Sequence, residues 1–162
     1  MKRPALRACR RRFPFGRSYV KMYRELRTEK EIEIRFSDVD SMKVVWHGNY
    51  VKYFEDAREA FGAEYGLGYL DIYAAGCYLP LVDLSLKFHR PLTFGSKAVV
   101  SATWRPCEAA KLIFDYEIRD AETGTLAVTG QSTQVFMNLD YQLLWTAPEF
   151  YENWKKRWMI AE

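Results

Sequence analysis

The chain has 162 residues, of which 49% are hydrophobic and 16% aromatic, which suits one compact domain with a real core and is too short for two ordinary ones. Charged residues make up 28% and interrupt the apolar runs, so no stretch approaches the roughly 20 apolar residues of a membrane-spanning helix. We therefore expect a soluble single-domain protein.

The cysteines and histidines follow none of the spacings that mark a structural site. Cys9, Cys77 and Cys107 are odd in number, far apart and without a CxxC pair, which argues against a disulfide framework and a zinc site. His47 and His89 lack the paired spacing of a HExxH helix. We expect a cytoplasmic protein that uses neither a metal ion nor a cofactor.

The net charge of +3 is unevenly distributed along the chain. Residues 1–21 contain eight basic and no acidic residues, whereas Met22–Glu162 contain sixteen basic and twenty-one acidic residues, a net charge of −5. A mildly acidic body does not indicate a nucleic-acid partner.

The basic segment shows neither an apolar period nor strand alternation, so residues 1–22 are predicted to be a disordered extension of a domain formed by residues 23–162. It lacks the apolar region of a secretory signal and is poorer in serine than a transit peptide. Charge alone leaves open an arm that docks on nucleic acid or an anionic membrane. We favour a translation start at Met22.

The first regular pattern begins at Glu29, where charged residues alternate with apolar ones. The period of two predicts a half-buried strand with Ile32, Ile34 and Phe36 on one face. A turn is expected over residues 37–43, and the Gly48-Asn49 pair offers a helix N-cap.

A long amphipathic helix is predicted to follow and to end at Gly66, and a short helical turn is expected over residues 69–75. Apolar side chains of the long helix are three or four residues apart: Tyr50, Phe54, Ala57, Phe61 and Tyr65.

The remaining sequence is typical of antiparallel strands. Strands are predicted over residues 82–89, 97–105, 111–119 and 125–137, with a terminal helix over 148–158. The last three strands read as a meander. The order predicts an α+β fold with about five strands around one long helix, and the sheet edges favour a homo-oligomer.

The stretch from Phe36 to Tyr50 brings a carboxylate, an imidazole and a helix start together. Thioester hydrolysis needs a carboxylate that attacks or activates water and donors for the carbonyl oxygen, which a helix N-terminus supplies. Asp40 and the amides near His47 fit these roles. On spacing alone, Asp40 also fits an ordinary Asx turn, and His47 also fits a structural histidine. His89 is expected on the polar face of its strand, and we assign it no role.

Three consecutive segments resemble one known family in order and spacing: Asp38-Val39-Asp40, Val44-Val45-Trp46-His47-Gly48-Asn49-Tyr50 and Lys52-Tyr53-Phe54-Glu55-Asp56-Ala57-Arg58. They resemble the DxD, V(V/W)(Y/H)xNY and YFExAR signature of the hot-dog acyl-CoA thioesterases of the 4-hydroxybenzoyl-CoA thioesterase group. A weaker similarity covers residues 88–92. The resemblance implies a hot-dog fold and hydrolysis of acyl-CoA.

The resemblance also implies the roles of single residues. Asp40 is the catalytic nucleophile or general base, Asp38 supports the turn, and the backbone N–H of His47 contacts the oxyanion. His47 in place of tyrosine favours aliphatic acyl groups.

Substrate contacts are expected from Tyr50 and Phe54 on the acyl group. Among the basic residues near the right strands, Arg90 ranks first, ahead of Lys87 and Lys97, for the coenzyme A phosphates. For both aromatic residues a plain core role is an equal alternative.

The turn departs from the family pattern at one place. Small residues, often glycine, are common between the acid and the Val-Val pair, whereas this chain has Met42 and Lys43. A positive φ there would be strained.

Two alternatives remain open at this point. The same pocket in a non-catalytic module would bind acyl-CoA or an acyl carrier protein without hydrolysis. A hot-dog dehydratase is less favoured, because its His-centred pattern is absent. The sequence also leaves open whether the substrate carrier is coenzyme A or an acyl-carrier protein, and whether the protein is a homodimer or a homotetramer.

Overall fold

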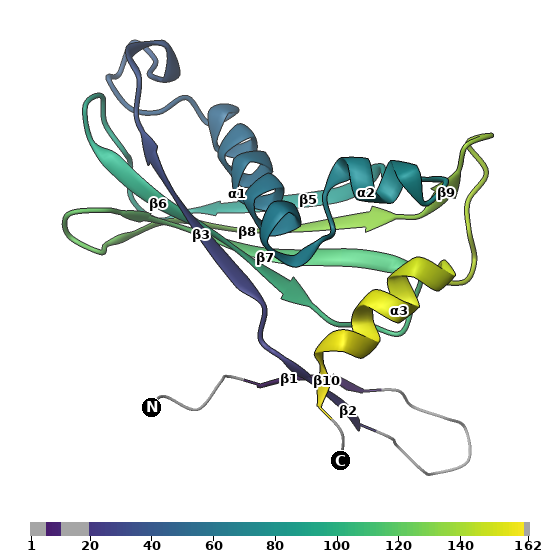
Figure 1. The fold of residues 1–162 in the computed structure, drawn as a ribbon. Helices are drawn as coiled ribbons and strands as arrows, with labels where there is room; N and C mark the ends of the chain where they lie inside the picture. Colours follow the sequence, from purple (N-terminus) through teal and green to yellow (C-terminus); the bar gives the residue numbers. More distant parts are fainter. Residues whose placement is uncertain (1–5, 11–19, 161–162) are drawn as a thin grey trace.

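The computed structural model describes residues 6–10 and 20–160, and its centre is a five-stranded antiparallel sheet in the order β3-β6-β7-β8-β5 (Figure 1). The strands are β3 (Arg27–Glu33), β5 (Leu81–Phe88), β6 (Lys97–Arg105), β7 (Lys111–Asp120) and β8 (Leu126–Val135). The short strands β4 (Cys77–Tyr78) and β9 (Met137–Asn138) pair separately. The predicted α+β class is confirmed.

The described residues also form the α-helices α1 (Asn49–Tyr65), α2 (Tyr69–Ala74) and α3 (Glu149–Trp158), which accompany the sheet (Figure 1). Helix α1 lies over β3 and β6 and ends at Gly66, which has a left-handed φ of 69°. Trp154 Nε1 donates a hydrogen bond to the carbonyl of Tyr65 at 2.7 Å, so α3 is attached to the end of α1. No helix in the described ranges is long and apolar enough to cross a membrane.

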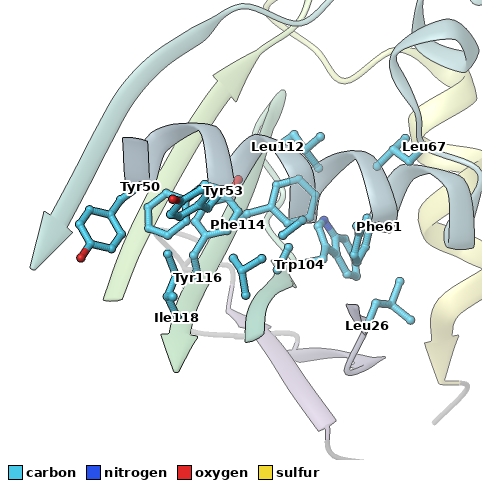
Figure 2. Packing of buried hydrophobic residues seen from close by; sticks show 14 of the residues in the cluster. Leu26, Tyr50, Tyr53, Phe61, Leu67, Trp104, Leu112, Phe114, Tyr116 and Ile118 are labelled. Carbon is cyan, nitrogen blue, oxygen red and sulfur yellow. The ribbon is translucent and has the colours of Figure 1, made fainter. Parts of the chain in front are cut away.

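Aromatic side chains fill the space between α1 and the sheet (Figure 2). The Phe54 ring stacks on Tyr116 with centroids 4.3 Å apart, and Phe61 meets Phe114 edge-on at 4.9 Å. Gly130 on β8 leaves room for Phe54, because a Cβ at this glycine would collide with the ring. The apolar side chains of the helix therefore pack on the apolar face of β7, whose residues alternate between the two faces of the sheet.

The meander is confirmed for β6, β7 and β8, which pair in sequence. Strand β5 pairs with β8 on the far side of the meander, so β3 and β5 are the two edges of the sheet. Leu84 lies opposite Ser132, and Leu86 lies opposite Gly130. This topology places the end of β5 beside the beginning of α1.

The prediction that Phe36 shares the buried face of the first strand is wrong. The chain leaves the sheet after Ile34, and Phe36 begins a 3-10 turn, η1 (Phe36–Asp38), with 78% of its surface exposed. Asp38 Oδ2 accepts a hydrogen bond from the Arg35 amide at 2.9 Å, so local side-chain bonding replaces the strand ladder. The Phe36 ring meets the Phe94 ring edge-on, with centroids 5.8 Å apart.

The predicted disorder of the basic extension does not hold for residues 6–10. Strand β1 (Leu6–Arg10) pairs with β2 (Val20–Arg24), and β10 (Met159–Ile160) adds to the other side of β2. Ladder hydrogen bonds and the ion pair of Arg7 with Asp115, 3.1 Å apart, stabilise this strand. The rest of the predicted extension before residue 20 lies outside the described residues.

Candidate active site

The loop between β3 and α1 is held to the helix by the backbone of Asp38. Its carbonyl oxygen accepts hydrogen bonds from the Trp46 amide at 2.8 Å and from Asn49 Nδ2 at 2.9 Å. The Gly48-Asn49 pair was expected to provide the N-cap, and Gly48 is the N-cap, while the buried Asn49 side chain reaches back to the loop. The loop conformation is therefore coupled to the first turn of α1.

Asp40 lies in a tight turn within this loop. Its amide donates to the Val44 carbonyl and its carbonyl accepts from Lys43, both at 2.9 Å. Asp40 Oδ1 accepts a hydrogen bond from the Met42 amide at 2.8 Å, which is the geometry of an Asx turn. Oδ2 makes no hydrogen bond within the described residues, which leaves one oxygen for chemistry.

Lys43 adopts a left-handed backbone conformation with φ of 63°. A side chain with a Cβ pays an energetic penalty in this region, which glycine avoids. The backbone strain that was expected if this turn required a positive φ is therefore present at Lys43.

A hollow of about 330 Å³ lies where this loop, the start of α1 and the end of β5 meet. Its size falls in the range of small-molecule sites. It is lined by Asp40, Met42, Val44, Val45, His47, Tyr50, Phe88, His89, Arg90 and Pro91. Four of the five predicted site residues, Asp40, His47, Tyr50 and Arg90, thus lie around one pocket.

Phe54, the fifth predicted site residue, does not line this pocket. It is buried beneath α1 against Tyr116 and Gly130, which is the core position named as its alternative. Lys87 and Lys97 also do not line the pocket, and Lys97 forms an ion pair with Glu31 at 2.8 Å.

The backbone at the start of α1 borders the pocket through His47. The His47 amide precedes the helix and makes no hydrogen bond within the described part of the chain. Unpaired amides at a helix start, together with the positive end of the helix dipole, stabilise negative charge. The exposed His47 side chain lies against the Trp46 ring, with centroids 4.8 Å apart.

Tyr50 and Phe88 form the aromatic wall of the pocket, with ring centroids 5.5 Å apart. Burial raises the pKa of the Tyr50 hydroxyl, so this group stays neutral near pH 7. Phe88 was not expected at the site, although the alternation already placed it on the apolar face at the end of its strand. Only the pairing of β5 with β8 brings it next to α1.

His89 also lines the pocket, and its Nε2 lies 3.0 Å from Thr129 Oγ1. Arg90 is exposed at the rim. The residues around the pocket therefore provide a carboxylate, the backbone amide of His47, an aromatic wall and an exposed cation.

Residues 34–155 match the model of the Thioesterase-like superfamily, and the chain belongs to this family. YneP of Bacillus subtilis (strain 168), with acyl-CoA thioesterase in its name, is 31% identical over 108 residues that cover 67% of this chain and 78% of YneP. A 1,4-dihydroxy-2-naphthoyl-CoA hydrolase of Synechocystis sp. is 28% identical over 67% of this chain and 80% of its own length.

The solved DHNA-CoA thioesterase of Staphylococcus aureus superposes with a TM-score of 0.72 and 27% identity. The match covers 81% of this chain and 90% of the other. The fold is thus the hot-dog fold, and the protein is a thioester hydrolase.

Proposed function

We propose that the protein hydrolyses acyl-coenzyme A thioesters and releases a free carboxylic acid and coenzyme A. The proposal depends mainly on the position of Asp40, which lines the same pocket as His47. Within the described residues, neither Asp40 Oδ2 nor the His47 amide makes a hydrogen bond. Relatives with acyl-CoA thioesterase and CoA hydrolase in their names support coenzyme A as the carrier.

In the proposed reaction, the thioester carbonyl lies between Asp40 and the start of α1. Asp40 attacks the carbonyl carbon, or takes the proton of a water that attacks it. The His47 amide donates to the carbonyl oxygen as negative charge develops there. The C–S bond then breaks, and the sulfur takes up a proton and leaves as the thiol of coenzyme A. Where water attacked, the carboxylic acid is released directly; where Asp40 attacked, water hydrolyses the mixed anhydride between the acyl group and Asp40 and releases the acid.

The surrounding residues orient the substrate. Tyr50 and Phe88 contact the acyl group at the thioester end, and Arg90 contacts a phosphate of coenzyme A at the rim. The side chain of His47 orients water or the thioester.

We also propose that the protein acts as a homo-oligomer in the cytoplasm. Strand β5 is an edge of the sheet, with β8 on one side only, and such an edge favours pairing with another chain. The two cysteines with described side chains, Cys77 and Cys107, are free thiols, which suits a reducing compartment.

The decisive experiment measures thiol release from a panel of acyl-CoA substrates by the wild type and by Asp40→Asn. The substitution keeps the Asx-turn acceptor and removes the negative charge, so turnover should fall by roughly two or more orders of magnitude with the melting temperature nearly unchanged. Asp140→Asn, which removes an exposed acid in the loop after β9, is the matched control and should retain full activity.

Equal turnover by the wild type and Asp40→Asn would remove Asp40 from the mechanism and leave the enzyme intact. Binding of acyl-CoA without thiol release by the wild type would instead establish a non-catalytic binding module.

A further inference from the structure

A second cavity, of about 350 Å³, lies between α1, α2 and the sheet and shares no lining residue with the candidate active site. Its floor is apolar and is formed by Leu67, Ile72, Leu79, Leu112 and Phe114. Charged residues of α1 form the rim, where Glu55 and Arg58 are ion-paired beside Asp56 and Glu59.

An apolar strip along β5 leads from the active-site pocket toward this cavity. Leu84 and Leu86 are paired with Ser132 and Gly130, which face Tyr116 and Phe54 beneath α1, so both leucines point to the helix side. Phe88 continues the strip into the active-site pocket.

The backbone of α1 lies nearest β3 and β6, and its Phe54 side chain reaches across to Tyr116 on β7 and Gly130 on β8, so the strip is uncovered mainly at its two ends. Phe88 at one end of β5 is 57% exposed and Leu81 at the other end is 43% exposed. Leu79, just before the strand, already lines the second cavity. Leu84 and Leu86 between these ends are half-buried and pack against the core, so an apolar strip that is exposed at its ends joins the two hollows. A partly exposed apolar strip of this kind is typical of a ligand-binding surface.

Charge decides which part of the substrate this surface fits. The cavity rim carries three acids and one arginine, which is already paired with Glu55, so the rim repels phosphate groups. Arg90, which forms no ion pair with another described residue, lies at the other pocket. The coenzyme A phosphates therefore belong near Arg90, and the apolar end of the substrate belongs in the cavity.

We propose that the second cavity holds the distal end of an aliphatic acyl chain, which runs from Asp40 along the helix side of β5. This assignment rests on the proposed acyl-CoA thioesterase function. Glu55 lies five residues after Tyr50, so the cavity begins about 8 Å along α1. From C–C bonds of about 1.5 Å, a butanoyl tail reaches about 4 Å past the carbonyl and a dodecanoyl tail about 14 Å. Only the longer chain enters the cavity.

The test compares kcat/KM for butanoyl-CoA and dodecanoyl-CoA in the wild type and in Leu79→Trp, which fills the cavity. The dodecanoyl value should fall at least about tenfold and the butanoyl value should stay within about threefold. Ser85→Trp, on the opposite face of β5, is the control and should change neither value.

Leu79→Phe repeats the test with a smaller side chain if the tryptophan variant does not fold. An equal loss on both substrates, or no loss on either, overturns the assignment. A wild type that hydrolyses butanoyl-CoA or aromatic acyl-CoA but not dodecanoyl-CoA also overturns it and leaves the proposed function standing. A wild type that hydrolyses no acyl-CoA refutes the proposed function itself.

Discussion

Lys43 shows how one residue adapts a shared loop. The turn that carries Asp40 closes through the hydrogen bond from the Lys43 amide to the Asp40 carbonyl, and this closure requires the left-handed φ of 63°. A residue with a Cβ costs on the order of 1 kcal/mol in that conformation. The chain therefore stores strain three residues from its candidate catalytic carboxylate.

Lys43→Gly is expected to raise the free energy of unfolding by about 1 kcal/mol, because glycine adopts a positive φ without strain. For a chain of this length the melting temperature should rise by about 2–4 °C, measured by thermal denaturation. Lys43→Ala removes the charge but keeps the Cβ and should bring no such gain. A gain of the same size in the alanine variant would show that removal of the charge causes the effect, and would contradict the claim that the Lys43 backbone is strained.

The sequence predicted the turn around Asp40, but not all of the hydrogen bonds that hold the loop. Its Asx turn and its candidate catalytic role were alternatives at the level of sequence, and the structure accommodates the first through Oδ1 while leaving Oδ2 unbonded. The hydrogen bond from Asn49 to the Asp38 carbonyl was not predicted, because it joins residues eleven apart in the chain through a side chain, and no local spacing indicates such a bond.

Strand β8 carries an unusual residue for its position. Gln134 is fully buried, paired with Leu112 on one side and Leu81 on the other, and its amide oxygen and nitrogen make no hydrogen bond within the described residues. A buried amide without partners destabilises the folded state by about 1–3 kcal/mol.

Gln134→Leu is therefore expected to raise the free energy of unfolding by about 1–3 kcal/mol, measured by urea denaturation. Gln131→Leu is the matched control on the other face of β8. There the amide donates to Asp115 Oδ1 at 2.9 Å, so its removal should bring no gain. A loss of stability in Gln134→Leu would show that a bound water or ligand satisfies the amide.

The whole molecule presents one long edge that a second copy would cover. Strand β5 has no neighbour on its outer side within the described residues, and its exposed Val82 lies at an irregularity in the pairing with β8. Edge strands with exposed apolar residues pair with other chains unless charge or proline prevents it. We therefore expect an oligomer that joins β5 to β5.

Val82→Glu should shift the protein toward the monomer, because it replaces an exposed apolar side chain of the pairing edge with a charged one, and charges on an edge strand oppose pairing. Light scattering after size-exclusion chromatography measures the mass of each variant. Phe94→Ser is the control, since Phe94 is equally exposed, at 58%, but lies in the turn between β5 and β6. A wild type that elutes as a monomer, or a Phe94→Ser that dissociates equally, would exclude the β5 interface.

Much of the fold was predictable from local pattern. Apolar residues three or four apart defined α1, alternation defined β6 and β7, and the glycine after Tyr65 ended the helix, because each signal depends on neighbours in the chain. The errors, at Phe36 and at strand β1, arose where distant or side-chain hydrogen bonds override local pattern.

The sequence by itself determined the helix and strand types, the loop that carries Asp40, and the family resemblance. Each of these resides in contiguous residues. Tertiary structure alone decided that β5 pairs with β8, that Phe88 faces Tyr50, and that Phe54 lies in the core outside the pocket. These contacts join segments far apart in the chain, and strand order in a sheet follows from the packing of the whole domain, which no local period encodes.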